Sequence, residues 1–199
     1  MTTRRGMLLA GAITLVGAGL RFWGLGLGLP HLMARPDDEG ILLMTGRVAQ
    51  GHLDLDWAVY PSAWVYVCWA WGAVTLRVGE WLHLLPRSGG YAQVLAAAPE
   101  RLLLLERGLS ALLGTLAIPA LIALAWRTIG APGALLAGWT QATNFLHARD
   151  WHSHKPDAAL SPAVVGVLGA SEALARGTTR PRALRAGAAL GAATAVKYP

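Results

Sequence analysis

Two clusters of charged residues have the side chains and spacing to do chemistry. The first is RPDDEG, whose acidic cluster, Asp37, Asp38 and Glu39, directly follows an apolar segment. Paired carboxylates at an apolar boundary suit general-base catalysis, because burial and like charge raise the pKa of one towards neutrality. They could instead solvate a loop or cap a short helix predicted from Ile41 to Gln50, since carboxylates favour the dipole at a helix start.

The second cluster, HARDWHSHKPDA, begins at His147 and is mainly basic. Arg149, His154 and Lys155 could together bind an anion, because arginine pairs with phosphate oxygens bidentately and lysine adds a point charge. Contact with lipid headgroups is the alternative. A divalent metal is conceivable, but the His-x-His spacing is weak evidence and a metal is not favoured. Asp157 could simply cap the helix that it begins.

Some residues inside apolar segments also need an explanation. Lys197 is costly in a membrane, so it should face an aqueous or phosphate-lined cavity or extend to the interface. The single cysteine, Cys68, excludes an internal disulfide and is expected to be a buried small apolar residue. Six aromatic residues could stack on sugar rings, but an interface belt is the favoured interpretation. These are Trp57, Tyr60, Trp64, Trp69, Trp71 and Trp81.

Composition indicates an integral membrane protein. Of the 199 residues, 54% are hydrophobic and 14% are charged, whereas soluble domains carry about a quarter charged residues. The net charge of +6 comes almost wholly from arginines scattered among apolar segments. Because they form no basic face, no nucleic-acid partner is expected. Membrane topology and anionic lipid explain the charge better.

The apolar segments predict five spans, joined by two long outer loops. The spans cover about 7–29, 107–126, 134–147, 158–175 and 186–199, and the outer loops cover 30–106 and 147–157. A cleaved signal peptide is the alternative for the first segment, but no good cleavage site follows it. Because the last segment is short, we expect the chain to be the N-terminal part of a longer protein.

The predicted topology depends on where the arginines lie. Loop 176–185 holds four arginines, and such loops stay cytoplasmic, as should the N-terminus with Arg4 and Arg5. The N-terminus and loop 176–185 can both be cytoplasmic only if the chain crosses the membrane an even number of times between them. We therefore expect segment 61–86 to lie along the membrane surface instead of crossing. The acidic cluster and the basic cluster then share the non-cytoplasmic face.

The order of motifs resembles one family along nearly the whole chain. RPDDEGILL, GHLDLDWAVYPSAWVYV, ERGLSALLGTLAIPAL, HARDWHSHKPDAAL and GAALGAATAVKYP follow one another as in polyprenyl-phosphate-sugar-dependent glycosyltransferases of the GT-C fold. The relatives include bacterial proteins similar to dolichyl-phosphate-mannose protein mannosyltransferases, and the lipid A aminoarabinose transferase. Each motif is short, so the order carries the resemblance. The chain departs from the family at YPS, 60–62, where relatives often have a double proline or a lysine before proline.

The resemblance implies a fold and a set of site residues. The fold would be an all-α, GT-C-like transmembrane helix bundle with surface-lying helices in the first outer loop. Asp38 would be the catalytic base with Glu39 beside it, while Asp37 is the expected helix cap. Asp157 matches a second functional aspartate, and a family Lys-Tyr pair recurs as Lys197 and Tyr198. The donor phosphate would be bound by Arg149, His154, Lys155 and Lys197.

The implied activity is sugar transfer from a polyprenyl-phosphate donor to an acceptor, with inversion, on the outer face of the bacterial inner membrane. The lipid-linked sugar is then substrate and partner, no cofactor is needed, and the acceptor stays open. Residues 1–199 would form the N-terminal part of a single catalytic domain, whose C-terminal remainder is absent, and would be inactive alone. A transporter or flippase of a lipid-linked or anionic substrate is the alternative, and a scaffold with merely interfacial charges is a third.

Overall fold

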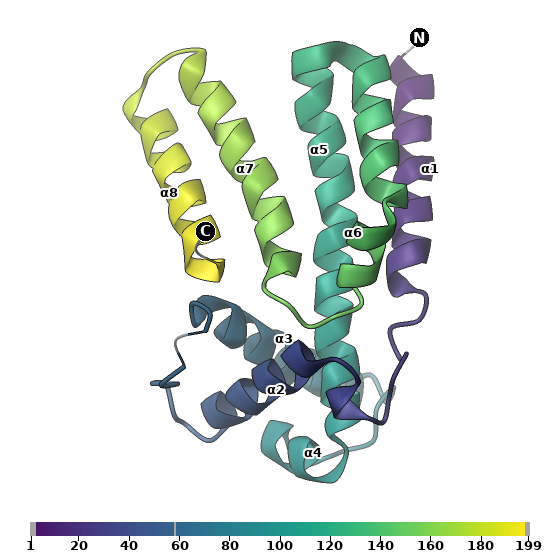
Figure 1. Ribbon diagram of the computed structural model, residues 1–199, viewed down its shortest axis with the longest axis vertical. Coiled ribbons are helices and arrows are strands. Elements are labelled where there is room, and N and C mark those ends of the chain that lie inside the picture. The colour runs from purple at the N-terminus through teal and green to yellow at the C-terminus, as the bar shows by residue number, and fades with distance from the viewer. Residues whose placement is uncertain (1–2, 58, 198–199) are drawn as a thin grey trace.

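The computed structural model describes residues 3–57 and 59–197, and every regular element in that part of the chain is a helix. The all-α prediction is therefore confirmed there, whereas Tyr198 lies outside the described residues. Four long helices stand side by side (Figure 1): α1 (Thr3–Phe22), α5 (Pro99–Thr143), α7 (Asp157–Ala175) and α8 (Arg180–Val196). The others are η1 (Leu32–Ala34), α2 (Pro36–Ala49), α3 (Ala63–Trp81), α4 (Tyr91–Ala97) and α6 (Phe145–Asp150).

Three helices are long and apolar enough to cross a membrane, namely Arg4–Phe22, Pro99–Thr143 and Asp157–Ala175. The first is shorter than the predicted span 7–29, because the chain after Phe22 forms turns. α8 is not one of these three helices, so the span predicted at 186–199 is not found within the described residues. Among the described helices, α3 does not qualify as a span either. It lies across the end of the bundle in Figure 1, which agrees with its predicted position outside the crossing segments.

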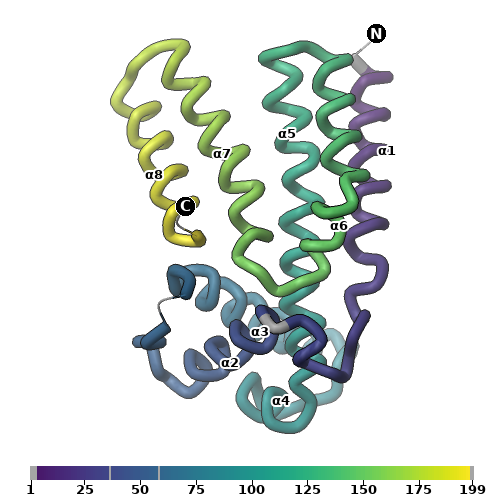
Figure 2. Tube along the Cα trace, viewed as in Figure 1, coloured from purple at the N-terminus to yellow at the C-terminus, as the bar shows by residue number. Residues whose placement is uncertain are grey.

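α5 consists of two antiparallel limbs joined at Gly130. This glycine has φ 78° and ψ 175°, outside the helical region, and Pro132 follows it. Glycine adopts positive φ without a Cβ clash, so the chain reverses there, near the top of Figure 2. The third predicted span, 134–147, ends early at Thr143, because Asn144 caps α6 by accepting a hydrogen bond from the His147 amide.

α1 packs against α5 through a close glycine contact and a buried arginine. Gly17 lies so near Ile118 that a methyl group in its place would clash. Arg21 is fully buried, and its guanidinium donates to the carbonyl oxygens of Gln141 and Ala142 at 2.9 and 3.1 Å. These carbonyls belong to the last turn of α5, where helical acceptors lack intrahelical donors and attract a cation.

The two ends of the bundle carry different loops. The N-terminal end of α1, the reversal at Gly130 and loop 176–179 lie together at one end, and α2, α3, α4 and loop 151–156 lie towards the other (Figure 1). The two predicted outer loops therefore share one end, and the arginine-rich loop shares the other with the N-terminus. This arrangement is the one that the even crossing count requires.

α2 begins five residues before the predicted start at Ile41, which places the acidic cluster in its first turn. Pro36 is at the start, where its missing N–H costs nothing, and the carboxylates face the positive end of the helix dipole. The N-cap residue is Arg35, and no side chain caps the helix. The prediction that Asp37 is the cap is therefore wrong.

The shared end can be tested by labelling with a membrane-impermeant thiol reagent. We expect His52→Cys and Thr143→Cys to be labelled from one side of the membrane and Thr178→Cys from the other, because all three positions are exposed and only the last lies at the arginine-rich end. The unmutated chain is the control, since Cys68 is fully buried. Labelling of positions 52 and 178 from the same side would contradict the topology.

Candidate functional site

A buried ion pair between Asp38 and Arg107 joins α2 to α5. The Arg107 Nε donates to Asp38 Oδ2 at 2.9 Å, and its Nη2 lies 2.8 Å from the same oxygen, with both side chains fully buried. Arg107 also donates to the carbonyl oxygens of Leu25 and Leu27 at 2.6 and 3.2 Å. The guanidinium therefore holds three segments together: the turn after α1, the start of α2, and the first limb of α5.

The other oxygen of Asp38 binds loop 151–156. Its Oδ1 accepts the backbone N–H of His154 at 2.6 Å. The His154 side chain is fully buried, and burial, followed by the positive charge of Arg107, lowers its pKa to about 3. The imidazole is therefore neutral at pH 7, so the prediction that His154 is a cationic phosphate ligand does not fit this structure.

The polar network continues from His154 to α4. The Nε2 of His154 lies 3.2 Å from Glu106 Oε2, and the other Glu106 oxygen accepts a hydrogen bond from the Tyr91 hydroxyl. That hydroxyl also lies 2.7 Å from Thr45 Oγ1. Burial and the neighbouring Glu106 charge raise the pKa of Tyr91 above its ordinary value, which keeps its proton available for donation. α2, α4, α5 and loop 151–156 are thus connected by buried polar groups.

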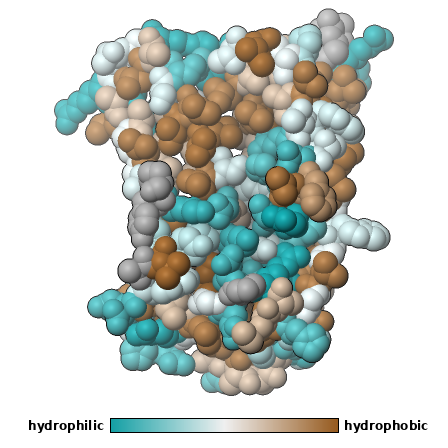
Figure 3. All heavy atoms as spheres, in the orientation of Figure 1, coloured by the Kyte–Doolittle hydropathy of each residue, from teal (hydrophilic) through white to brown (hydrophobic). Residues whose placement is uncertain are grey.

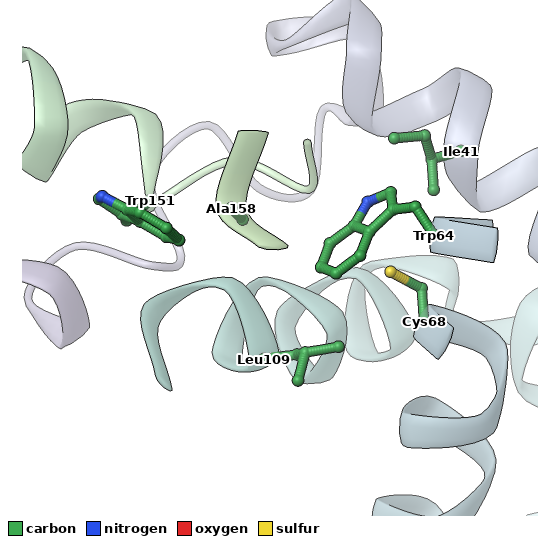
Figure 4. Packing of buried hydrophobic residues seen from close by; sticks show 6 residues of the cluster. All are labelled: Ile41, Trp64, Cys68, Leu109, Trp151 and Ala158. Carbon is green, nitrogen blue, oxygen red and sulfur yellow. The ribbon is translucent and has the colours of Figure 1, made fainter. Parts of the chain in front are cut away.

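An apolar cluster packs beside this network and fixes the same loop. Figure 4 shows Trp151 and Ala158 on one side of Leu109, with Ile41, Trp64 and Cys68 on the other; all six are buried. Trp151 lies directly against Gly114, where any side chain on the glycine would clash with the indole. Trp64 is only 1% exposed, so its predicted place in an interface belt is wrong, whereas the predicted burial of Cys68 is confirmed.

The resulting scaffold presents a charged cavity of about 250 Å³ at the start of α2. Arg35 donates to Ser153 Oγ at 2.9 Å, and Lys155 Nζ lies 3.1 Å from Asp37 Oδ2. The third cation, Arg149, is half-exposed and pairs with its neighbour Asp150 at 3.0 Å. The lining is Ala34, Arg35, Asp37, Arg149, Asp150, Ser153 and Lys155. Three cations therefore face one small cavity, and two of them, Arg149 and Lys155, are predicted phosphate ligands.

An apolar groove of about 430 Å³ adjoins the charged cavity, because Asp150 lines both. The groove runs along α7, and its walls are mainly Leu146, Trp151, Ala158, Leu160, Val164 and Val165. Figure 3 shows hydrophilic residues gathered across the middle of this face, with hydrophobic residues above them over the long helices. The arrangement offers a charged site for a head group beside an apolar surface for a chain.

Asp157 and Lys197 form a separate ion pair at the edge of this groove. Lys197 Nζ lies 2.7 Å from Asp157 Oδ1 and 5.8 Å from the centre of the Tyr60 ring. Asp157 also lines the groove, but Lys197 does not line the charged cavity. Glu39 is partly exposed and makes no side-chain hydrogen bond or ion pair within the described residues. The predicted site residues are therefore distributed over a cavity, a groove and a buried network.

Metal binding was the other possibility for the acidic and histidine side chains. Within residues 3–57 and 59–197, no group of three or more histidine, cysteine, aspartate or glutamate side chains is arranged to hold a metal ion. The nearby histidines are used otherwise: His147 Nδ1 accepts a hydrogen bond from the Trp151 indole at 2.7 Å, and His152 Nε2 lies 2.9 Å from the Leu20 carbonyl oxygen.

Several residues of the site were not identified from the sequence. Arg35 and Ser153 gave no signal, because their proximity depends on how two distant loops fold together. Glu106 and Arg107 did give one: an adjacent acid and base within an apolar helix are costly unless each finds a partner. A search for their partners would have led to the acidic cluster and the basic cluster.

Comparisons with protein-family models, curated proteins and solved structures find no match to this chain.

The buried pair predicts a large difference between neighbouring aspartates. Asp38→Asn leaves Arg107 charged and unpaired in the interior, so we expect it to destabilise the protein by about 3–5 kcal/mol. Asp37→Asn breaks only a partly exposed pair and should change the stability by less than about 1 kcal/mol. Chemical unfolding in detergent, followed by tryptophan fluorescence, measures both. Equal stability of the two variants would show that the pair does not hold the loops.

Proposed function

We propose that this chain is the donor-binding part of a membrane glycosyltransferase that moves a sugar from polyprenyl phosphate to an acceptor. One observation carries the proposal: the cavity lined by three cations adjoins an apolar groove at the end of a bundle of membrane-length helices. A lipid-linked phosphosugar has the matching chemistry, since an anionic phosphate joins a sugar to a long apolar chain. The order of sequence motifs supports the same class of donor.

Arg149 and Lys155 are the proposed ligands of the donor phosphate, with Arg35 as a third cation. Arginine can bind two phosphate oxygens at once, and lysine contributes a compact charge. Such cations favour the reaction because the bridging phosphate oxygen gains negative charge as the sugar leaves. The first part of the prenyl chain would lie in the groove along α7, against Leu160 and Val164.

The reaction is a single displacement at the anomeric carbon. A carboxylate takes the proton of the acceptor hydroxyl or amine, and the acceptor atom forms a bond to that carbon from the face opposite the phosphate. The bond between the carbon and the phosphate oxygen breaks, and its electron pair leaves with polyprenyl phosphate. Phosphate is a weakly basic leaving group, so no strong general acid is required. The anomeric configuration inverts.

The acidic cluster offers two carboxylates for proton abstraction. The family resemblance assigns this role to Asp38, and that assignment stays a prediction; here both of its oxygens are occupied by Arg107 and the His154 amide. Asp37 lines the cavity and is about half-exposed, beside Lys155. In this conformation we assign the base to Asp37 and give Asp38 the task of positioning loop 151–156. The groove-lining Asp157 is placed to orient the acceptor or the donor.

Transfer is tested with a radiolabelled polyprenyl-phosphate sugar, proteoliposomes holding the full-length protein, and source-cell membranes as acceptor. We expect label to move from the lipid to an acceptor. The double substitution Arg149→Gln with Lys155→Gln removes two positive charges and should lower the rate of sugar transfer by at least tenfold, because phosphate stabilisation is lost. Arg5→Gln, an exposed cation on α1, is the matched control. Label that changes leaflet while still on the lipid would identify a flippase instead.

The assignment of the base has its own test. Asp37→Asn should fold normally and lose about 10²–10⁴-fold in transfer rate, the usual contribution of a general base. Donor binding, measured by retention of the labelled lipid, should change far less, which separates chemistry from binding. Full transfer by Asp37→Asn would overturn this assignment and return the role to Asp38. In that case a folded Asp38→Asn protein would bind donor without transferring sugar.

A further inference from the structure

We infer that the opposite end of the bundle holds a second anion site, built for the phosphate head group of an anionic membrane phospholipid. The site is a cavity of about 490 Å³ between α5, α7 and α8. Three arginines and three small residues line it: Arg127, Arg182, Arg185, Gly169, Ala170 and Ala173. It lies at the arginine-rich end, remote from the proposed donor cavity, and the inference does not depend on the proposed function.

The cations of this cavity exceed its anions. Glu172 is the carboxylate at this position, and it pairs with Arg127 at 2.7 Å and also with Arg176. Arg182 donates to the Gly177 carbonyl oxygen at 2.9 Å. In the described part of the chain, the Arg185 side chain makes no hydrogen bond or ion pair. Among the described residues, two guanidinium groups on one wall are therefore without a carboxylate partner, which favours an external anion.

The shape of the site allows a ligand to enter between the helices. Small residues on α7 leave the space, since Gly169, Ala170 and Ala173 project little or nothing into it. Arg182 and Arg185 lie in the first two turns of α8, near its N-terminus, where the helix dipole adds to their positive potential. The cations are thus placed on one side of a cavity whose opposite wall is a small-residue face.

A lipid is favoured over a free anion because the helices that form the cavity carry exposed apolar side chains. Leu168 on α7 and Leu184 on α8, each next in sequence to a lining residue, are 53% and 64% exposed. Hydrophilic residues gather at the upper left of Figure 3, over the turn between α7 and α8, directly above hydrophobic ones. A phosphate head group in the cavity would leave its acyl chains free to follow the exposed apolar surface of these helices. Basic pockets between transmembrane helices are suited to anionic lipid head groups in this way.

The test measures lipid binding to the full-length protein in neutral detergent by native mass spectrometry. The probes are phosphatidylglycerol, phosphatidylcholine and inorganic phosphate. We expect phosphatidylglycerol to bind more tightly than phosphatidylcholine. Arg182→Gln with Arg185→Gln should weaken phosphatidylglycerol binding roughly 30-fold, at about fivefold for each cation lost near the surface. Arg4→Gln with Arg5→Gln removes the same charge from α1 at the same end and should change binding by less than about twofold.

A second variant separates the site from net charge. Ala173→Leu fills the cavity without removing a cation, and it should also weaken phosphatidylglycerol binding. The proposed site would be overturned if both double arginine variants lost phosphatidylglycerol binding equally. It would also be overturned if phosphatidylcholine bound as tightly as phosphatidylglycerol. Displacement of the lipid by an equal concentration of inorganic phosphate would overturn the lipid assignment. Because none of these measurements uses sugar transfer, a failure here is distinct from a failure of the proposed glycosyltransferase.

Discussion

The buried contact between Asp38 and Arg107 determines how the polar loops are assembled. It joins residues 69 positions apart in the sequence, and Asp38 also receives the amide of His154. The start of α2 and loop 151–156 are also joined by the apolar cluster and by the network from His154 to Thr45. The buried pair adds a direct charged contact beside Arg35 and Ser153, and beside Asp37 and Lys155. The pair therefore helps to hold the walls of the charged cavity together.

Such a pair is costly to bury, and its surroundings explain why it is tolerated. Removing two ions from water costs several kcal/mol each, which attraction offsets only where the remaining hydrogen-bonding groups are satisfied. Here Arg107 donates hydrogen bonds to the carbonyl oxygens of Leu25 and Leu27, and Asp38 accepts one from the His154 N–H. An apolar replacement would pack as well but would not select one arrangement of three loops. We attribute the charges to this positional specificity.

The sequence was sufficient to predict the helical class and which loops share one end, but not the number of spans or the contacts of the site. Apolar segments and arginine placement predicted that the acidic and basic clusters share one end, because these signals are local and follow from membrane physics. The pairing of Asp38 with Arg107, and the burial of His154, depend on tertiary packing that no local pattern encodes. Gly130 shows the intermediate case: a turn was predicted at RTIGAPG, but its role in reversing one long helix needs the backbone angles.

Two of the three cavity cations are already paired with carboxylates, whereas Arg35 donates to Ser153, and this constrains how an anion could act there. Lys155 contacts Asp37, and Arg149 contacts Asp150, all with partly exposed side chains. Under the proposed function, a donor phosphate must therefore replace these two carboxylates instead of filling an empty site. When it takes Lys155, Asp37 loses its cation and becomes free to accept a proton. Under the proposed function, donor binding would thus release the base at the moment when the leaving group is in place. When no donor is bound, Asp37 would stay paired with Lys155.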